Sequence, residues 1–392
     1  MNKSFLIKDV TIYGENGPFK NAYLKVSDGI ISEMGEIETL QEKDADFEVI
    51  SFSDHYSLLP GFIDVHIHGA GGADTMDATP EALIVMAETL PREGTTSFLA
   101  TTITQSSDAI EKALENAAQF IKKNNEPGKA EVLGIHLEGP FISPNMAGAQ
   151  PKQFITSPDT DTFKKWQELA SGHIRLVTLA PEQEGGIELT KYLKDIGVIP
   201  SIGHSEATYR QVLEAVEAGV SHATHLFNQM RGLHHREPGV VGAVYLRDEI
   251  MAELIADTIH VSPEMINISY RLLGKERLVL ITDALRAKCL KNGIYDLGGQ
   301  EVTVSDGKAQ LKDGTLAGSI LKMNEAIIHM LKFTDANLID LVEMTSGNPA
   351  RELNIFNRKG SIAKGKDADL VILDENYDVV LTMCRGKIAY QK

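Results

Sequence analysis

Cysteine is almost absent from the sequence. The 392 residues include only Cys289 and Cys384, and neither lies in a spacing typical of metal-binding cysteines. A disulfide framework is therefore not expected. The chain also lacks an apolar run of about 18 residues, so no membrane span is predicted. Its first residues contain no cationic stretch followed by a long apolar one, so we expect no signal peptide and a cytoplasmic protein.

Basic residues are fewer than acidic ones. The chain has 38 Lys and Arg against 55 Asp and Glu, a formal net charge of -17. This balance argues against a general affinity for nucleic acid or for an anionic membrane. It does not argue against a small anionic ligand, which responds to the charges of its own site. The hydrophobic content of 43% is typical of a globular protein with a large core.

Both ends of the chain contain short β-strand patterns separated by turn residues. The N-terminal patterns cover residues 5–7, 10–13, 22–26 and 29–34, and the C-terminal ones cover 360–362, 368–373 and 379–382. A hairpin turn is expected at 385–387. We therefore predict one small β-sandwich domain built from residues 1–58 and 355–392, with residues 59–354 forming a separate catalytic domain.

The middle of the chain alternates between strand and helix patterns. Strands are predicted at residues 62–68, 95–101, 131–137, 174–179, 198–203, 222–227, 251–256 and 277–282. Helices are predicted at 80–93, 107–124, 158–171, 206–218, 263–273, 324–333 and 337–346, with a turn-rich β excursion at 287–316. This alternation predicts a parallel sheet, and eight strands close a (β/α)8 TIM barrel. A doubly wound open sheet is the alternative.

Two histidines end the first of these strands. His66 and His68 are two residues apart, so in an extended strand their side chains project from the same face. Two imidazoles on one face can hold one metal ion, and imidazole suits zinc, iron and nickel. The alternative is a pair of surface histidines near a turn.

Histidines and carboxylates recur where later strands end, which is where a parallel barrel carries its functional groups. Glu138 and Asp283 each follow an apolar run, where an unpaired carboxylate costs several kcal/mol unless it binds a metal. We therefore interpret both as functional. The other side chains at these ends are His136, His204, His222, His225, Asp257 and His260, of which His136 and His222 are expected to point into the barrel wall.

A mixed set of histidines and carboxylates favours a divalent metal used for hydrolysis. Such a metal lowers the pKa of bound water to about 7 and polarises a carbonyl group. Asp283 could accept the proton of that water and pass it to the leaving group. The sequence therefore predicts metal-assisted hydrolysis of an amide or a related C–N bond.

This arrangement resembles the amidohydrolase superfamily. The runs PGFIDVHIHG, HLEGPF, GHS, THLFNQM, REPG, LITDA and LAGS resemble, more narrowly, the N-acetylglucosamine-6-phosphate deacetylase family over almost the whole chain. The resemblance implies hydrolysis of N-acetyl-D-glucosamine 6-phosphate to D-glucosamine 6-phosphate and acetate, in amino-sugar catabolism and cell-wall recycling. A cyclic amidase or a deaminase on the same scaffold is the alternative. A non-enzymatic sugar-phosphate sensor or metal-storing scaffold is a third reading.

The resemblance also implies a ligand set. One metal would lie among Glu138, His204 and His225, and a second would lie near His66 and His68, with Glu138 bridging and Asp283 nearby. Many amidohydrolases use a carboxylated lysine as the bridge, whereas Glu138 takes that role in the resembled family. One or two divalent ions are expected, zinc or iron.

Substrate contacts follow from the same resemblance. His260 is expected near the sugar or the acetyl carbonyl, and Arg236 is expected to pair with the phosphate through its planar fork. A rim ion pair between Arg236 and Glu237 is the alternative. A homodimer is expected, with the loop after the EGP motif reaching the neighbour's site, although Gln150 departs from the histidine that some members carry there. The full expected set is Ala149, Gln150, Asn228, Gln229, Arg236, His260, Leu316 and Gly318.

Overall fold

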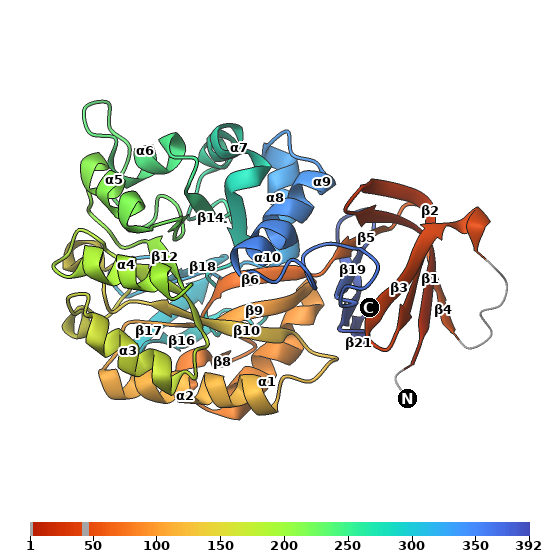
Figure 1. The fold of residues 1–392 in the computed structure, drawn as a ribbon, viewed down its shortest axis with the longest axis horizontal. Coiled ribbons are helices and arrows are strands. Elements are labelled where there is room, and N and C mark those ends of the chain that lie inside the picture. The colour runs from red at the N-terminus through yellow and green to blue at the C-terminus, as the bar shows by residue number, and fades with distance from the viewer. Residues whose placement is uncertain (1–2, 41–46) are drawn as a thin grey trace.

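A computed structural model describes residues 3–40 and 47–392 of the chain. A barrel with its surrounding helices forms the larger part, and a sheet built from both ends of the chain lies beside it (Figure 1). Residues 1–2 and 41–46, which belong to the predicted terminal domain, lie outside the described residues.

Eight parallel strands form the barrel. They are β6 (Phe62–Ile67), β9 (Thr95–Thr102), β10 (Glu131–Glu138), β11 (Ile174–Leu179), β12 (Ile199–Ile202), β13 (His222–Ala223), β14 (Met251–Ile255) and β15 (Leu278–Ile281), hydrogen-bonded in this order. At the seam between the last and first strands, Asp283 N donates to His66 O at 2.8 Å and His68 N donates to Ala284 O at 2.9 Å. The predicted TIM barrel is therefore confirmed, and the alternative of a doubly wound open sheet is not observed in the described residues.

One barrel strand is much shorter than predicted. The apolar pattern predicts a strand over residues 222–227, but β13 ends at Ala223. The backbone then turns, because His225 has a φ of 32° and Phe227 a φ of 79°. The histidine that the sequence places in a strand therefore lies in a turn at the barrel mouth.

Helices surround the barrel, and several begin at clear capping residues. Thr79 accepts a hydrogen bond from Ala82 N and is followed by Pro80, and Thr208 forms a capping box with Gln211. The helices are α1 (Pro80–Thr89), α2 (Ser107–Lys123), α3 (Thr160–Leu169), α4 (Gly186–Asp195), α5 (Tyr209–Ala218), α6 (Gly239–Leu246), α7 (Pro263–Arg277), α8 (Met323–Phe333), α9 (Leu338–Val342) and α10 (Asn348–Glu352). The helix predicted over 337–346 divides into α9 and a π-helical turn, Glu343–Gly347.

Both ends of the chain contribute to one sheet. Its strands are β1 (Phe5–Gly14), β2 (Gly17–Ser27), β3 (Ile30–Glu36), β4 (Glu48–Ser51), β5 (Ser57–Pro60), β19 (Leu370–Leu373), β20 (Val379–Cys384) and β21 (Lys387–Gln391). β5 pairs with β1 on one side and with β19 on the other, so it joins the two halves. A common core includes Ile7, Leu24, Leu370 and Leu381. Of the strand predicted at 360–362, only a single bridge between Ile362 and Gly14 is present. The domain boundaries given above stay predictions.

The predicted excursion after the eighth barrel strand is a small antiparallel sheet. It consists of β16 (Gly293–Leu297), β17 (Gln300–Ser305) and β18 (Lys308–Gln310). Its apolar side chains Leu297, Val302 and Val304 pack with Ile103 and Leu285, which follow barrel strands β9 and β15. A second short hairpin, β7 (Gly69–Ala70) with β8 (Ala73–Asp74), follows β6. The excursion therefore packs against the end of the barrel where the strands lead into their loops.

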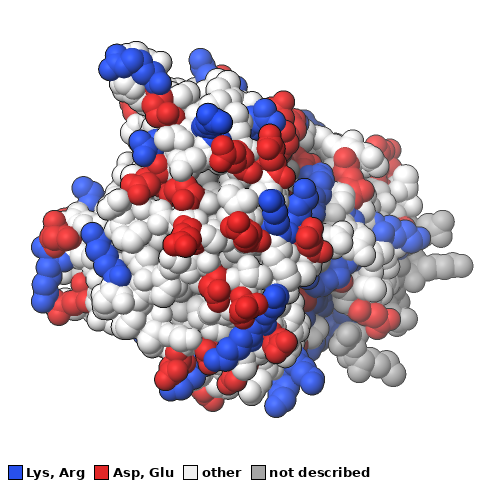
Figure 2. Space-filling model, turned by 60° about the vertical axis from the view of Figure 1, so that its left-hand side comes forward, with Lys and Arg blue, Asp and Glu red and all other residues white. Residues whose placement is uncertain are grey.

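Among the described residues, no helix is long and apolar enough to cross a membrane. On the face drawn in Figure 2, acidic and basic side chains are interspersed.

Candidate metal centre and substrate pocket

The five side chains predicted as metal ligands lie together at the mouth of the barrel. None has more than 4% of its surface exposed: His66, His68, Glu138, His204 and His225. Asp283, the predicted proton carrier, is 8% exposed beside them. These six residues come from five barrel strands, β6, β10, β12, β13 and β15, or from the turns that follow them, which explains how positions far apart in the chain meet.

Glu138, His204 and His225 form the first candidate ligand group. Glu138 Oε1 lies 3.1 Å from Nε2 of His204 and 3.1 Å from Nε2 of His225. The two Nε2 atoms are 3.2 Å apart. One carboxylate oxygen and two imidazole nitrogens thus converge on one point, as a single ion requires.

His66, His68 and Asp283 form the second group. Asp283 Oδ1 lies 3.4 Å from His66 Nε2 and 3.3 Å from His68 Nε2. The Glu138 carboxylate lies 3.6 Å from His66 Nε2 and 3.2 Å from His68 Nε2. Glu138 therefore stands between the two groups, where one carboxylate could contact two ions.

Three of these residues have a left-handed backbone. His204 and Asp283 each have a φ of 47°, and His225 has a φ of 32°. Such conformations are uncommon outside glycine, cost on the order of 1–3 kcal/mol each, and cluster at functional sites. The chain therefore maintains strained turns at the strand ends that carry its candidate ligands.

The charges of the cluster fit a divalent cation. Nε2 of His66 and Nδ1 of His68 and His225 are buried and have no hydrogen-bond partner among the described residues. Burial alone would lower the pKa of His68, but Asp283 and Glu138 raise that pKa to about 10. Burial would raise the pKa of Glu138, but the surrounding histidines hold it well below its usual range. The site favours positive charge, and its nitrogen and oxygen donors suit zinc or iron.

Further polar groups orient the candidate ligands. His204 Nδ1 donates to Met146 O at 2.7 Å, which turns Nε2 of the same ring toward Glu138. Gln150 Nε2 donates to Glu138 Oε2 at 2.7 Å, and Gln150 Oε1 accepts from Thr104 N at 2.8 Å. The loop that carries Gln150 was expected to reach the site of the neighbouring chain. In the structure, Gln150 contacts the metal-ligand cluster of its own chain.

Sequence reasoning missed Glu253. It is fully buried in β14, and its Oε2 lies 2.9 Å from His66 Nδ1. The signal was present, because Glu253 interrupts the apolar strand Met251–Ile255 in the same way that Glu138 ends its own apolar run.

The two histidines assigned to the barrel wall are there. His136 Nδ1 donates to Val65 O at 3.2 Å, and its Nε2 accepts from the Thr178 hydroxyl at 2.7 Å. Burial lowers the pKa of His136 well below its usual value, so the ring is neutral. His222 lies between Glu253 and Glu352.

A cavity of about 270 Å³ opens over the metal-ligand cluster. His260, which lines it, is held by Asp257, whose Oδ2 accepts from His260 Nδ1 at 2.6 Å. The size is close to that of small-molecule sites, roughly 300 Å³ and above. The predicted substrate contacts that line this cavity are Ala149, Gln150, Asn228, Gln229, His260, Leu316 and Gly318.

Arg236 is the one predicted substrate contact that the structure does not bring into this cavity. Its side chain is exposed, and Nη1 lies 2.7 Å from His235 Nε2. Glu237, the alternative partner, accepts instead from the backbone N–H groups of Tyr209 and Gly239. Arg236 therefore lies on an exposed loop, outside the lining of the pocket in this chain.

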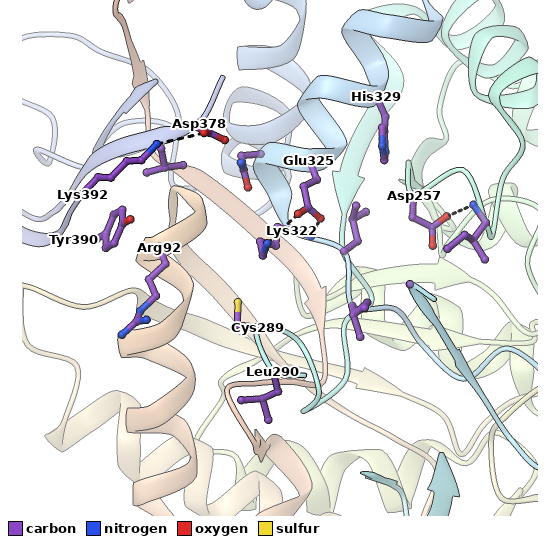
Figure 3. A pocket seen from close by; sticks show the side chains of 16 residues that line it. Arg92, Asp257, Cys289, Leu290, Lys322, Glu325, His329, Asp378, Tyr390 and Lys392 are labelled. Atoms are coloured by element: carbon purple, nitrogen blue, oxygen red, sulfur yellow. Dashed lines mark hydrogen bonds and ion pairs between the residues drawn. The ribbon is translucent and has the colours of Figure 1, made fainter. Parts of the chain in front are cut away.

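A larger cavity of about 630 Å³ lies between the barrel and the terminal sheet (Figure 3). Its labelled side chains include two ion pairs, Lys322 with Glu325 at 2.9 Å and Lys392 with Asp378 at 3.3 Å. None of the candidate ligand groups found in the described residues lines it. The chemistry therefore points to the smaller cavity.

A TIM barrel with histidines and carboxylates at its mouth is the arrangement of a metal-dependent hydrolase. The model of the amidohydrolase family matches residues 57–389. The chain belongs to this family.

Individual relatives agree along the whole chain. The N-acetylglucosamine-6-phosphate deacetylase of Bacillus subtilis (strain 168) is 50% identical over 392 residues, which cover 100% of this chain and 98% of that protein. The N-acetylgalactosamine-6-phosphate deacetylase of Escherichia coli O157:H7 is 36% identical and covers 96% of both chains. A solved mutant of N-acetyl-D-glucosamine-6-phosphate deacetylase from Mycobacterium smegmatis, in complex with N-acetyl-D-glucosamine-6-phosphate, has a TM-score of 0.92 at 28% identity and covers 99% of this chain and 100% of its own.

Proposed function

We propose that the chain hydrolyses N-acetyl-D-glucosamine 6-phosphate to D-glucosamine 6-phosphate and acetate, in amino-sugar catabolism and cell-wall recycling. The relative that is 50% identical over the full chain carries this activity in its name. The observation that carries the proposal is the convergence of Glu138, His204 and His225 within 3.2 Å of one another, in the cavity that also contains Asp283.

The proposed centre holds one or two divalent ions, zinc or iron. Glu138, His204 and His225 would bind one ion, and His66, His68 and Asp283 would contribute to the other. When bound, the cation lowers the pKa of a water molecule and polarises the acetyl carbonyl.

Asp283 is the proposed proton carrier. It lines the cavity, and burial alone would raise the pKa of its carboxyl group, but His66 and His68 lower that pKa. The carboxylate is therefore ionised and able to accept the proton of the attacking water. The same group then delivers the proton to the departing amine, as general acid–base catalysis requires.

The remaining roles concern the sugar phosphate. His260, fixed by Asp257, is proposed to contact the sugar or the acetyl carbonyl. Asn228 and Gln229 are proposed to hold the phosphate end through their backbone groups. Arg236 would pair with the phosphate from its exposed loop, since a guanidinium matches phosphate oxygens. We further propose that the protein is a homodimer and that it is cytoplasmic. The cytoplasmic location is supported by the two cysteines, Cys289 and Cys384, which form no disulfide, as is usual for proteins of a reducing compartment.

Acetate release tests this function directly. We expect release from N-acetyl-D-glucosamine 6-phosphate, much slower release from the unphosphorylated sugar, and loss of release with a strong chelator. The galactosamine epimer, named in one relative, serves as a stereochemical comparison. Absence of acetate from the phosphorylated sugar, with hydrolysis of a cyclic amide instead, would replace this proposal with a cyclic amidase.

A further inference from the structure

Glu253 contacts residues of both candidate ligand groups. Its Oε2 accepts from His66 Nδ1 at 2.9 Å and from the backbone N–H of His225 at 3.0 Å. His66 belongs to the second group and His225 to the first. A single fully buried carboxylate thus holds one histidine by its ring and another by its strained backbone.

Glu253 is itself held by His222. His222 Nε2 lies 3.2 Å from Glu253 Oε1, and His222 Nδ1 lies 2.9 Å from Glu352 Oε1. An ionised carboxylate only accepts hydrogen bonds, so both ring nitrogens of His222 are donors. His222 is therefore a buried imidazolium between two carboxylates, and neither of its nitrogens has a lone pair left to bind a metal.

We propose that Glu253 is a positioning residue for the metal centre, held in place by His222 and Glu352. As acceptor for His66 Nδ1, Glu253 assigns the ring proton to that nitrogen and leaves the Nε2 lone pair facing Glu138 and Asp283. This inference rests on the proposed function, because it requires that the centre bind a cation. Carboxylates that accept the second N–H of a histidine ligand commonly orient it in this way.

A third group of possible ligands, His66, His136 and Glu253, does not compete with this role. Both ring nitrogens of His136 are already engaged, by Val65 O and by the Thr178 hydroxyl. The ring nitrogens of His136 and the carboxylate oxygens of Glu253 already have hydrogen-bond partners within the protein, so this group does not need an ion to satisfy its polar atoms. Glu253 supports the centre from outside it.

The test measures metal affinity rather than turnover. In the full chain, Glu253→Gln is titrated with Zn²⁺ against a competing chelator, and the Co²⁺-loaded protein reports ligand geometry through its visible spectrum. We expect the metal Kd to rise by about 10–100-fold, with an altered Co²⁺ spectrum. The matched control is Glu131→Gln. Glu131 is a buried carboxylate that pairs with Arg358 and lies at the end of β10 opposite to Glu138. This variant should lower the melting temperature and leave the metal Kd unchanged.

Two outcomes separate this inference from the proposed function. A Zn²⁺ Kd for Glu253→Gln equal to that of the wild type, with tight binding by both, overturns the positioning role alone. Failure of the wild-type chain to bind Zn²⁺ or Fe²⁺ overturns both. If Glu253→Gln does not fold, the same titration is made on His222→Gln, which changes the residue that holds Glu253. We expect the metal Kd of this variant to rise less, by roughly tenfold or under.

Discussion

Strand β10 carries a buried carboxylate at each end, and the two have opposite surroundings. At its start, Glu131 lies 2.7 Å from Arg358 Nη2 and 2.8 Å from Lys359 Nζ. At its end, Glu138 is surrounded by histidines, with no lysine or arginine ion pair to it found in residues 3–40 and 47–392. One strand thus presents the same chemical group to permanent cations at one end and to titratable partners at the other.

The difference between the partners of Glu131 and Glu138 indicates how a buried carboxylate in a structural ion pair can be distinguished from a candidate metal ligand. Near Glu131, Asp367 and Asp369 also face Arg358 and Lys359, so positive charge is supplied permanently. Burial would raise the pKa of Glu131, but Lys359 and Arg358 lower it to about 2. Near Glu138, positive charge depends on protons that imidazole can release when a metal arrives. The second arrangement leaves a place for an exchangeable cation.

The largest expected effect is on turnover. Asp283→Asn removes the proposed proton carrier while preserving shape, and we expect kcat for acetate release to fall by about 10²–10⁴-fold. Metal content should persist at the group formed by Glu138, His204 and His225. Near-normal kcat in Asp283→Asn would reassign the proton transfer to another group.

The opposite end of β10 should respond in stability and not in chemistry. Glu131→Gln removes one of the carboxylates that face Arg358 and Lys359, while Asp367 and Asp369 remain, so we expect the free energy of unfolding to fall by on the order of 1–3 kcal/mol. Denaturant unfolding measures this loss, and kcat per folded molecule should be unchanged. A large fall in kcat with intact stability would contradict the division between the two ends.

The pH dependence of stability sharpens the same comparison. Because the pKa of Glu131 is lowered from 4.5 to about 2 in the fold, its stabilisation is present above pH 4.5 and is lost as the pH falls toward 2. The difference in unfolding free energy between wild type and Glu131→Gln should therefore shrink between pH 5 and pH 2.5. A difference that stays constant across this range would show that the charge of Glu131 is not its source.

The smallest expected effect lies on the rim. Arg236 is exposed, so Arg236→Ala should leave stability and metal content unchanged and should raise the KM for the phosphorylated sugar by about tenfold. The unphosphorylated sugar is the control, since its KM should not change. An unchanged KM for the phosphorylated sugar would remove Arg236 from the phosphate site.

The barrel and its ligand cluster could be predicted because their signals are local. An apolar run that ends in histidine or carboxylate marks a strand end, and parallel strands bring such ends to one rim. The end of β13 could not be predicted, because the turn through His225 and Phe227 is set by tertiary contacts and their apolar pattern continues past it. The contact of Gln150 with Glu138 depends on loop geometry, which leaves no periodic signal.

Glu253 shows a different limit. Its position in an apolar strand marks it as unusual, but the sequence does not say which histidine it meets 187 positions away. Arg236 shows the reverse, because a side chain suited to phosphate was expected in the pocket and lies outside its lining. Residue type predicts chemistry well, whereas partners depend on the closed fold.

The seam of the barrel has a consequence for how this protein is made. His66 and Asp283 come from the first and last barrel strands, and the hydrogen bond from Asp283 N to His66 O joins them. During synthesis on the ribosome, His66 and His68 are therefore made long before Asp283, the third member of this candidate ligand group. The candidate ligand group of His66, His68 and Asp283 is complete only after the barrel has closed, so the metal binding proposed for it would follow barrel closure.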